Sequence, residues 1–170
     1  MNPSPAPWRS AVLSALSLLV GAVLLGTAVN LLRPSPLPWV GDWSHHVETL
    51  ALRASVPVVY LPELKSLFAS DSPPVFVDAR SPAEFAVSRI PHAVSIPAPG
   101  TEDDFLALAD TVQHDLSSPV VVYCSGLDCA DALDVAKNLR DRGWSGVRLY
   151  PGGFSEWSRY DNPVEQGVLP

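Results

Sequence analysis

The chain is poor in cysteine. Its 170 residues include only two, and both lie in one short segment, at Cys124 and Cys129. Any thiol chemistry of the protein must therefore take place in that segment. The spacing of these two cysteines, with the four histidines scattered elsewhere, does not match the ligand spacings of zinc sites. We expect no metal ion and no cofactor.

Basic residues are also few. The chain has 11 Lys and Arg residues against 18 Asp and Glu residues, which gives a formal net charge of −7. Proteins that bind DNA or RNA normally present a basic face to the phosphates, so we expect no nucleic-acid partner. The length and the 47% share of hydrophobic residues allow one domain of ordinary size with an appendage.

Charge is absent from residues 10–32, and Arg9 and Arg33 flank this run. A helix rises about 1.5 Å per residue, so the run is long enough for a hydrocarbon core of about 30 Å. The sequence therefore predicts a transmembrane helix at 10–32. It would follow an N-terminal tail at 1–9 and precede a Pro-rich juxtamembrane linker at 33–56.

Two alternatives to a membrane span need weighing. A cleavable signal peptide has a shorter apolar stretch of about 7 to 15 residues, although residues 26–28 offer a small-x-small cleavage site. A buried globular helix fits less well, because the run is apolar on all sides. Arg9 and Arg33 put one basic residue on each side of the run, so the positive-inside rule barely distinguishes the two possible orientations of the helix in the membrane. We expect the soluble domain outside the cytoplasm, where a disulfide between Cys124 and Cys129 could form.

The rest of the chain alternates between short apolar runs and helical patterns, which predicts a domain over residues 57–162 and a C-terminal tail at 163–170. Strands are expected at 58–60, 75–80, 93–96, 120–123 and 147–150. Helices are expected at 61–69, 102–116, 130–142 and 153–160. A further short helix is expected to begin at the capping box formed by Ser81 and Glu84. Such alternation indicates an α/β fold with a mostly parallel sheet flanked by helices.

Cys124 directly follows the apolar run at 120–123, at the carboxyl end of a strand, where such sheets bind ligands. Ser125 and Gly126 allow a tight turn, and the helix that starts near Ala130 points its N–H groups and positive dipole end at the loop. That environment lowers a cysteine pKa from about 8.5 to about 3.5–7.5. We expect Cys124 to be an ionised nucleophile. The alternative is that both cysteines only pack at a strand end.

Four segments, in this order and spacing, resemble the motifs of a rhodanese-like sulfurtransferase domain: residues 76–85, 89–93, 121–124 and 150–157. An apolar span before a single such module also resembles the membrane-anchored bacterial members. The resemblance implies that Cys124 accepts a sulfane sulfur as a persulfide and passes it to a nucleophile. Its partners would be a small sulfur-containing donor and a thiol acceptor, with a redox or sulfur-relay protein as a further candidate.

The resemblance also assigns roles to residues. The loop that would bind the anion and the persulfide consists of Ser125, Gly126, Leu127, Asp128, Cys129 and Ala130. Asp78 and Arg80 match residues that support the active-site face structurally, as an ion pair. His92 stands where the family usually has glycine.

The loop departs from thiosulfate-active members, which commonly carry a basic residue directly after the cysteine and again at the fifth following position. Here these positions hold Ser125 and Cys129, and Asp128 adds a negative charge. Because charge-assisted contacts are about twice as strong as neutral ones, this loop should bind a dianion weakly. Cys129 is instead a candidate resolving thiol that could form a disulfide with Cys124.

Two functions follow from the sequence. The first is a membrane-anchored sulfurtransferase or persulfide carrier with Cys124 as nucleophile. The second is a thiol–disulfide or partner-binding module that uses Cys124 and Cys129 without thiosulfate activity. Dual-specificity phosphatases share the resembled fold, but their loop is one residue longer and ends in arginine, whereas this one ends at Ala130. We therefore do not expect phosphatase activity.

Overall fold

The structure is a computed structural model that describes residues 7–34, 37 and 46–167. The N-terminal helix α1 extends over Pro7–Leu31. It contains an apolar stretch of 21 residues, Ala11–Leu31, with a mean hydropathy of 2.3, and the most apolar part of this stretch is not buried against other residues. It is long and apolar enough to cross a membrane. A signal sequence near the N-terminus has the same properties.

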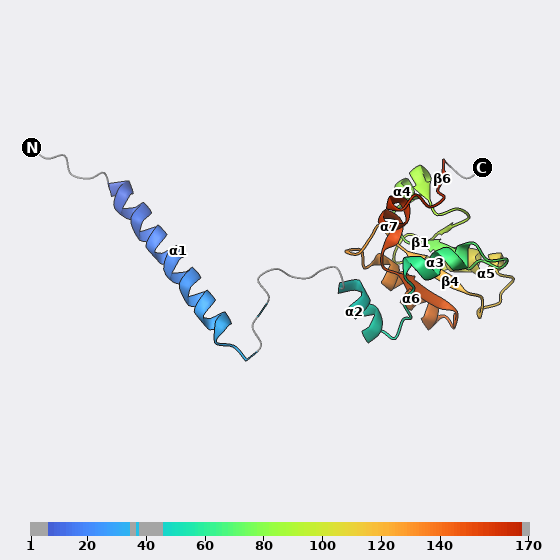
Figure 1. Cartoon of the computed structure of the whole chain (residues 1–170), viewed down its shortest axis with the longest axis horizontal. Helices are drawn as coiled ribbons and strands as arrows, with labels where there is room; N and C mark the ends of the chain where they lie inside the picture. The colour runs from blue at the N-terminus through green and yellow to red at the C-terminus, as the bar shows by residue number, and fades with distance from the viewer. Residues whose placement is uncertain (1–6, 35–36, 38–45, 168–170) are drawn as a thin grey trace, which may run out of the picture. The chain divides into compact units, whose positions relative to one another are not determined.

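A four-stranded parallel sheet, with β1 and β4 in its middle, lies at the centre of the domain (Figure 1). Its strand order is β3-β1-β4-β5. In register, Val77 of β1 lies opposite Val94 of β3 and Val122 of β4, and Val122 lies opposite Leu149 of β5. The sheet consists of β1 (Val75–Asp78), β3 (Val94–Ser95), β4 (Val120–Tyr123) and β5 (Val147–Tyr150). All its strand pairs are parallel, as the alternation of strands and helices predicts.

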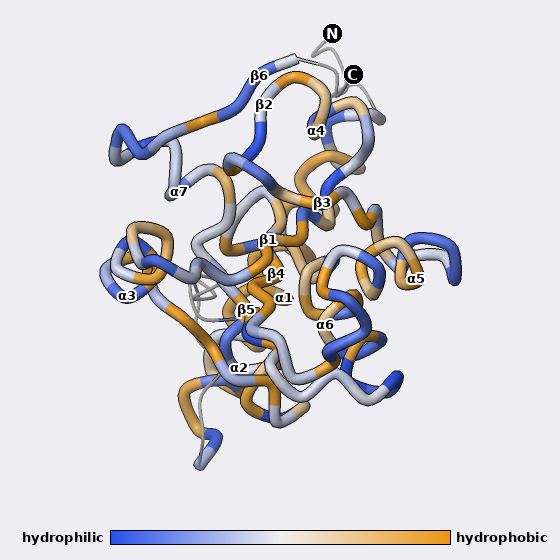
Figure 2. The backbone as a smooth tube through the Cα atoms, turned by 90° about the vertical axis from the view of Figure 1, so that its right-hand side faces the viewer, coloured by the Kyte–Doolittle hydropathy of each residue, from blue (hydrophilic) through white to orange (hydrophobic). Residues whose placement is uncertain are grey.

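Helices cover both faces of this sheet. They are α2 (His46–Arg53), α3 (Leu61–Phe68), α4 (Pro82–Val87), α5 (Glu102–Thr111), α6 (Asp131–Asp141) and α7 (Gly153–Arg159). Figure 2 shows α3 on one side of the apolar strands β1, β4 and β5, and α5 and α6 on the other. A separate antiparallel pair joins β2 (Ser88–Arg89) to β6 (Glu165–Gln166).

Strand β4 is buried throughout and divides the core in two, because successive side chains of a strand point to opposite faces. Val120 and Val122 pack in the cluster that includes α2, α5 and α6. Val121 and Tyr123 pack in the cluster that includes Trp157 of α7, whose indole N–H donates to the Pro163 carbonyl at 2.7 Å. The continuous apolar run at 120–123 is thus a strand covered on both faces.

The domain is longer at both ends than the sequence indicated. Within the expected linker at 33–56, α2 buries Val47 and Ala51 in the core. Within the expected tail at 163–170, Glu165 forms an ion pair with the buried Arg89. Both boundaries were wrong because a short helix and a two-residue strand carry too little periodicity to be distinguished from a loop.

Two elements are clearly shorter than expected. The segment at 58–60 forms only an isolated bridge, from Val58 to Leu149, instead of a strand. The helix expected at 102–116 ends at Thr111, and Gln113 and His114 follow with positive φ angles of 54° and 59°. A helix cannot continue through left-handed residues, so the chain turns there.

Candidate active site

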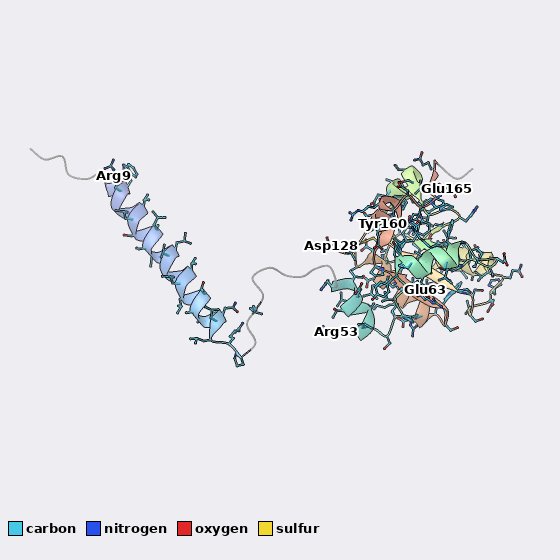
Figure 3. The ribbon with its side chains drawn as sticks, in the orientation of Figure 1. Arg9, Arg53, Glu63, Asp128, Tyr160 and Glu165 are labelled. Carbon is cyan, nitrogen blue, oxygen red and sulfur yellow. A yellow bond between two sulfur atoms is a disulfide. The ribbon has the colours of Figure 1, made fainter. Side chains whose placement is uncertain are left out.

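The candidate site lies at the carboxyl end of β4, where the strand runs into the loop that precedes α6. The loop forms one side of a cavity of about 690 Å³, and α7 forms the other. The cavity is lined by Ser125, Gly126, Leu127, Asp128, Cys129, Ala130, Asp131, Gly152, Ser155, Glu156, Arg159 and Tyr160. Figure 3 labels Asp128 and Tyr160, one from each side. All six predicted loop residues lie together around this cavity.

Cys124 and Cys129 are joined by a disulfide bond, with their Cα atoms 6.1 Å apart. The question that the sequence left open, whether these two cysteines pair, thus has an answer in this structure. The expected ionised thiolate is not the state observed, because a sulfur in a disulfide does not titrate. The nucleophile becomes available only after reduction.

Backbone geometry holds the loop against the start of α7. The Phe154 N–H donates to the Cys124 carbonyl at 2.8 Å, and the Ser155 N–H donates to the Ser125 carbonyl at 2.9 Å. Gly153 makes this approach feasible, because its φ is +61° and an added Cβ would lie 2.5 Å from the Cys124 carbonyl oxygen. The two glycines at 152–153 were part of the sequence pattern, but the close backbone contact that they allow between the cysteine loop and α7 was not predicted.

Most amides of the loop have no backbone acceptor in the described part of the chain, and the loop residues line the cavity. Among the described residues, the Cys129 N–H is the one loop amide from Ser125 to Ala130 with a backbone acceptor, the Gly126 carbonyl at 3.0 Å. Helix α6 begins directly afterwards, and no side chain caps its first turn. Unpaired amides at a helix N-terminus are donors for an anion.

One carboxylate lies beside the sulfur of Cys124, and a second is linked to it through Ser125. Its Sγ lies 4.0 Å from Asp131 Oδ2 and 3.8 Å from the Ser125 hydroxyl, which in turn donates to Glu84 Oε1 at 3.3 Å. The Ser81 hydroxyl hydrogen bond lowers the pKa of Glu84, so this carboxylate remains ionised at neutral pH. A reduced Cys124 would therefore have negative neighbours that oppose its ionisation, against the helix N-terminus that favours it.

The cavity does contain a cation. Arg159, from the last turn of α7, lines it opposite the loop, and within the described part of the chain it makes no ion pair. The sequence interpretation, which looked for a basic residue only inside the loop, missed it. Glu156 and Arg159 are three residues apart in a helix and so share a face, but the sequence contains no signal that this face meets the loop.

Asp78 and Arg80 form the predicted ion pair beside the site. The Arg80 guanidinium donates to both carboxylate oxygens of Asp78, at 2.9 Å from Nε and 2.5 Å from Nη2, and both side chains are buried. It also lies 4.2 Å from the centre of the Phe154 ring, on α7. Burial alone lowers the pKa of Arg80, but the hydrogen bond and charge of Asp78 raise it overall, so the guanidinium stays charged.

A metal ion is a weaker candidate for this place. Cys124, Cys129 and Asp131 bring possible ligand atoms within 4.8 Å of one another. In the disulfide, however, neither sulfur is a thiolate, and the thiolate is the form that binds metal ions. The residues of this oxidised state do not fit a metal centre.

The family model of the rhodanese-like domain matches residues 61–160. The chain belongs to the rhodanese-like family. The matched segment runs from α3 to the end of α7 and contains Cys124, the loop and the residues that line the cavity.

Several relatives are similar to this rhodanese-like chain. The human thiosulfate:glutathione sulfurtransferase is 35% identical over 113 residues, which are 61% of this chain and 95% of that protein. The tRNA uridine(34) hydroxylase of Sodalis glossinidius is 30% identical over 101 residues, 59% of this chain but only 27% of that protein. This chain therefore matches about a quarter of the hydroxylase.

Solved structures show the same fold. Thiosulfate sulfurtransferase from Pseudomonas aeruginosa has a TM-score of 0.59 at 21% identity, over 75% of this chain and 23% of that one. A human single-domain sulfurtransferase has a TM-score of 0.51 at 30% identity, over 63% of this chain and 99% of that one. Both of these structures are named as sulfurtransferases, and in this chain Cys124 lies at the start of the strand-to-helix turn that the sequence indicated.

Proposed function

We propose that the protein is a membrane-anchored rhodanese-like sulfurtransferase or persulfide carrier with Cys124 as its nucleophile. The observation that carries the proposal is the position of Cys124 at the end of β4, beside a cavity lined by unpaired loop amides and by Arg159. Family membership supports the same chemistry. The donor would be a small sulfur compound, the acceptor a thiol, and no nucleic acid would take part.

The reaction consists of two displacements at sulfur. The reduced Cys124 thiolate attacks the sulfane sulfur of a donor such as thiosulfate, and the bond to the sulfonate breaks, so that sulfite leaves with the electron pair. An acceptor thiolate then attacks the outer sulfur of the Cys124 persulfide, takes that sulfur and releases the Cys124 thiolate. The amides of Ser125 to Ala130, apart from that of Cys129, would donate to the anionic persulfide.

Intact-mass spectrometry tests this function. The full chain, reduced and purified in a mild detergent, should gain the mass of one sulfur atom from thiosulfate or from an organic persulfide. Cys124→Ser should gain none, whereas Cys129→Ala should keep the added sulfur. A wild-type chain that gains no sulfur from either donor after complete reduction would contradict the proposal.

A second function has an observation of its own. The Cys124–Cys129 disulfide favours a thiol–disulfide or partner-binding module, with Cys129 as the resolving thiol. Non-reducing peptide mapping after mild oxidation tests it, and two free thiols would count against it. The Cys129→Ala variant distinguishes the two functions. It should still take up sulfur if the first function holds, whereas under the second function Cys124 has lost the cysteine with which it forms the disulfide.

We further propose that α1 anchors the protein, with the domain outside the cytoplasm. The length and hydropathy of α1 support an anchor, and a disulfide suits an oxidising compartment. Extraction of membranes at alkaline pH should leave the full-length chain in the pellet. An N-terminus cleaved within α1, or release into the supernatant, would favour the signal-peptide alternative.

A further inference from the structure

The two sulfurs of the disulfide differ in how they meet the cavity. Cys124 is only 3% exposed and packs in the core cluster next to β4. Cys129 is half-buried and is the cysteine that lines the cavity. A molecule in the cavity therefore meets the sulfur of Cys129 first.

Access, not charge, distinguishes the two sulfurs. Asp131 Oδ2 lies 4.0 Å from Cys124 Sγ, but it also lies within 4.8 Å of Cys129 Sγ, so its charge acts on an attacker at either sulfur. A displacement at sulfur also needs the attacker in line with the bond that breaks. Because Cys129 lines the cavity and Cys124 does not, an attacker in the cavity reaches Cys129, and Cys124 becomes the departing sulfur.

We propose that the oxidised protein is activated by a thiol reductant that enters this cavity and attacks Cys129. The reductant thiolate forms a bond to Cys129 Sγ, the Cys129–Cys124 bond breaks, and Cys124 leaves with the electron pair as a thiolate. A second thiol of the reductant then attacks the reductant sulfur that is bonded to Cys129 in the mixed disulfide. This step releases the Cys129 thiolate and oxidises the reductant to a disulfide, so two electrons pass from the dithiol to the protein.

Attack at Cys129 makes Cys124 the leaving group. The loop that carries both cysteines precedes the uncapped N-terminal end of α6, which favours a negative charge on the released sulfur. Exchange is faster when the attacked sulfur is accessible. Accessibility favours attack at Cys129, and the product is the free Cys124 nucleophile of the proposed sulfur transfer.

The charge of the cavity indicates what kind of thiol enters it. Three carboxylates line it, those of Asp128, Asp131 and Glu156, against one guanidinium, that of Arg159. A thiol that carries positive charge next to its sulfur is attracted by this lining, and an anionic thiol is repelled. The reductant, small molecule or protein, should thus present a cationic group beside its thiol.

Trapping identifies the attacked sulfur. The full oxidised chain in detergent is given a short pulse of cysteamine, then excess iodoacetamide, and each cysteine is read by tandem mass spectrometry. We expect the mixed disulfide on Cys129 and the alkyl group on Cys124. The reverse pattern, an even split, or no disulfide after mild oxidation would each overturn the inference. This result does not depend on sulfur transfer, which the sulfur-uptake experiment tests separately.

Rates test the charge argument. Reduction by cationic cysteamine should exceed reduction by anionic 2-mercaptoethanesulfonate by at least about threefold per thiolate at low ionic strength, and less at high salt. Asp128→Asn should narrow this ratio. Asp103→Asn, the same change at an exposed residue outside the cavity, should leave it as in wild type. Equal reduction rates for the two thiols, or an equal decrease of their rate ratio in both variants, would overturn the inferred preference for a cationic thiol.

Discussion

The ion pair of Asp78 and Arg80 is the residue-scale feature on which the active-site face depends most. Asp78 is fully buried, and Arg80 is 5% exposed. Removal of one partner of a buried pair leaves an uncompensated charge and costs about 3–5 kcal/mol. We expect Asp78→Asn to lower the free energy of unfolding by about that amount in urea titrations followed by tryptophan fluorescence.

The matched control is Asp134→Asn, the same change in the exposed pair with Lys137, where both side chains are at least half exposed. Exposed pairs contribute about 0.2–1 kcal/mol. If the two variants lost equal stability, the pair of Asp78 and Arg80 would have no special structural role.

His92 is in a left-handed conformation, with a φ of 62°. An L residue pays about 1–2 kcal/mol there, which glycine avoids, and part of this gain is lost to the greater freedom of glycine in the unfolded chain. We expect His92→Gly to raise the free energy of unfolding by about 0.5–1 kcal/mol. His92→Ala keeps the Cβ and should change it little, so equal effects of the two variants would contradict the backbone argument.

Arg159 gives a prediction about the donor. Its guanidinium is the one cation among the described residues that line the cavity, and a hydrogen bond to a charged group contributes about 1.5–3 kcal/mol. Arg159→Gln should therefore reduce the rate of sulfur uptake from thiosulfate about tenfold or more. Uptake from an uncharged organic trisulfide should change much less.

The matched control for Arg159 is Arg53→Gln, the same change at an exposed arginine of α2 (Figure 3) that does not line the cavity. Equal loss in both variants, or equal loss with both donors, would show that Arg159 does not bind the donor anion. The sequence could not place Arg159 at the site, because its proximity to the loop arises only when α7 packs beside β4.

At the scale of the element, the start of α7 is the support of the cysteine loop. An alanine at Gly153 would need a left-handed φ and would put its Cβ 2.5 Å from the Cys124 carbonyl oxygen. We expect Gly153→Ala to cost more than about 2 kcal/mol, as substitutions at incompatible φ angles do, and to slow the re-formation of the disulfide after reduction, measured by thiol titration.

Gly126→Ala is the control within the same contact. Its φ is not in the left-handed range, and an added Cβ would lie 3.6 Å or more from its neighbours, an ordinary contact distance. This variant should lose less than about 1 kcal/mol. A similar loss in both variants would mean that the loop tolerates no change at all, rather than depending on the approach of α7.

Elements with strong local signals were predicted well. Ser81 accepts the Glu84 N–H and the Glu84 side chain accepts the Ser81 N–H, as the capping-box pattern indicated. The run at 120–123 is the buried strand β4. The prediction of a strand at 58–60 was wrong, because its β-branched composition resembles that of a strand although only an isolated bridge forms, at Val58. Pairing is decided by the neighbouring strand, which local sequence does not contain.

At the scale of the whole molecule, the order of strands and helices gave the parallel sheet, but the extent of the domain depended on contacts distant in sequence. α2 follows a Pro-rich segment and is only eight residues long, too short for a clear periodic signal. Its place became evident only from the burial of Val47 and Ala51 against the core. The state of the two cysteines was equally undecided, because residue spacing alone does not determine whether they pair.

Two fragments test where the domain begins. One starts at Asp42, where the second compact unit of the chain begins, and the other at residue 57, the boundary that the sequence indicated. The shorter one lacks Val47, Ala51 and Val56, which are at most 2% exposed. Full burial contributes about 1.5–3 kcal/mol for each valine, so the loss approaches the 5–15 kcal/mol that stabilises a whole domain.

We therefore expect the fragment from Asp42 to unfold cooperatively in urea, and the fragment from residue 57 to unfold at lower urea concentration or to bind the dye ANS without denaturant. In the full chain, Val47→Ala should cost about 1–2 kcal/mol, whereas Leu52→Ala, at a position of α2 that is 74% exposed, should cost less than about 0.5 kcal/mol. Equal stability of the two fragments would mean that α2 only lies on the core and does not belong to the folded unit.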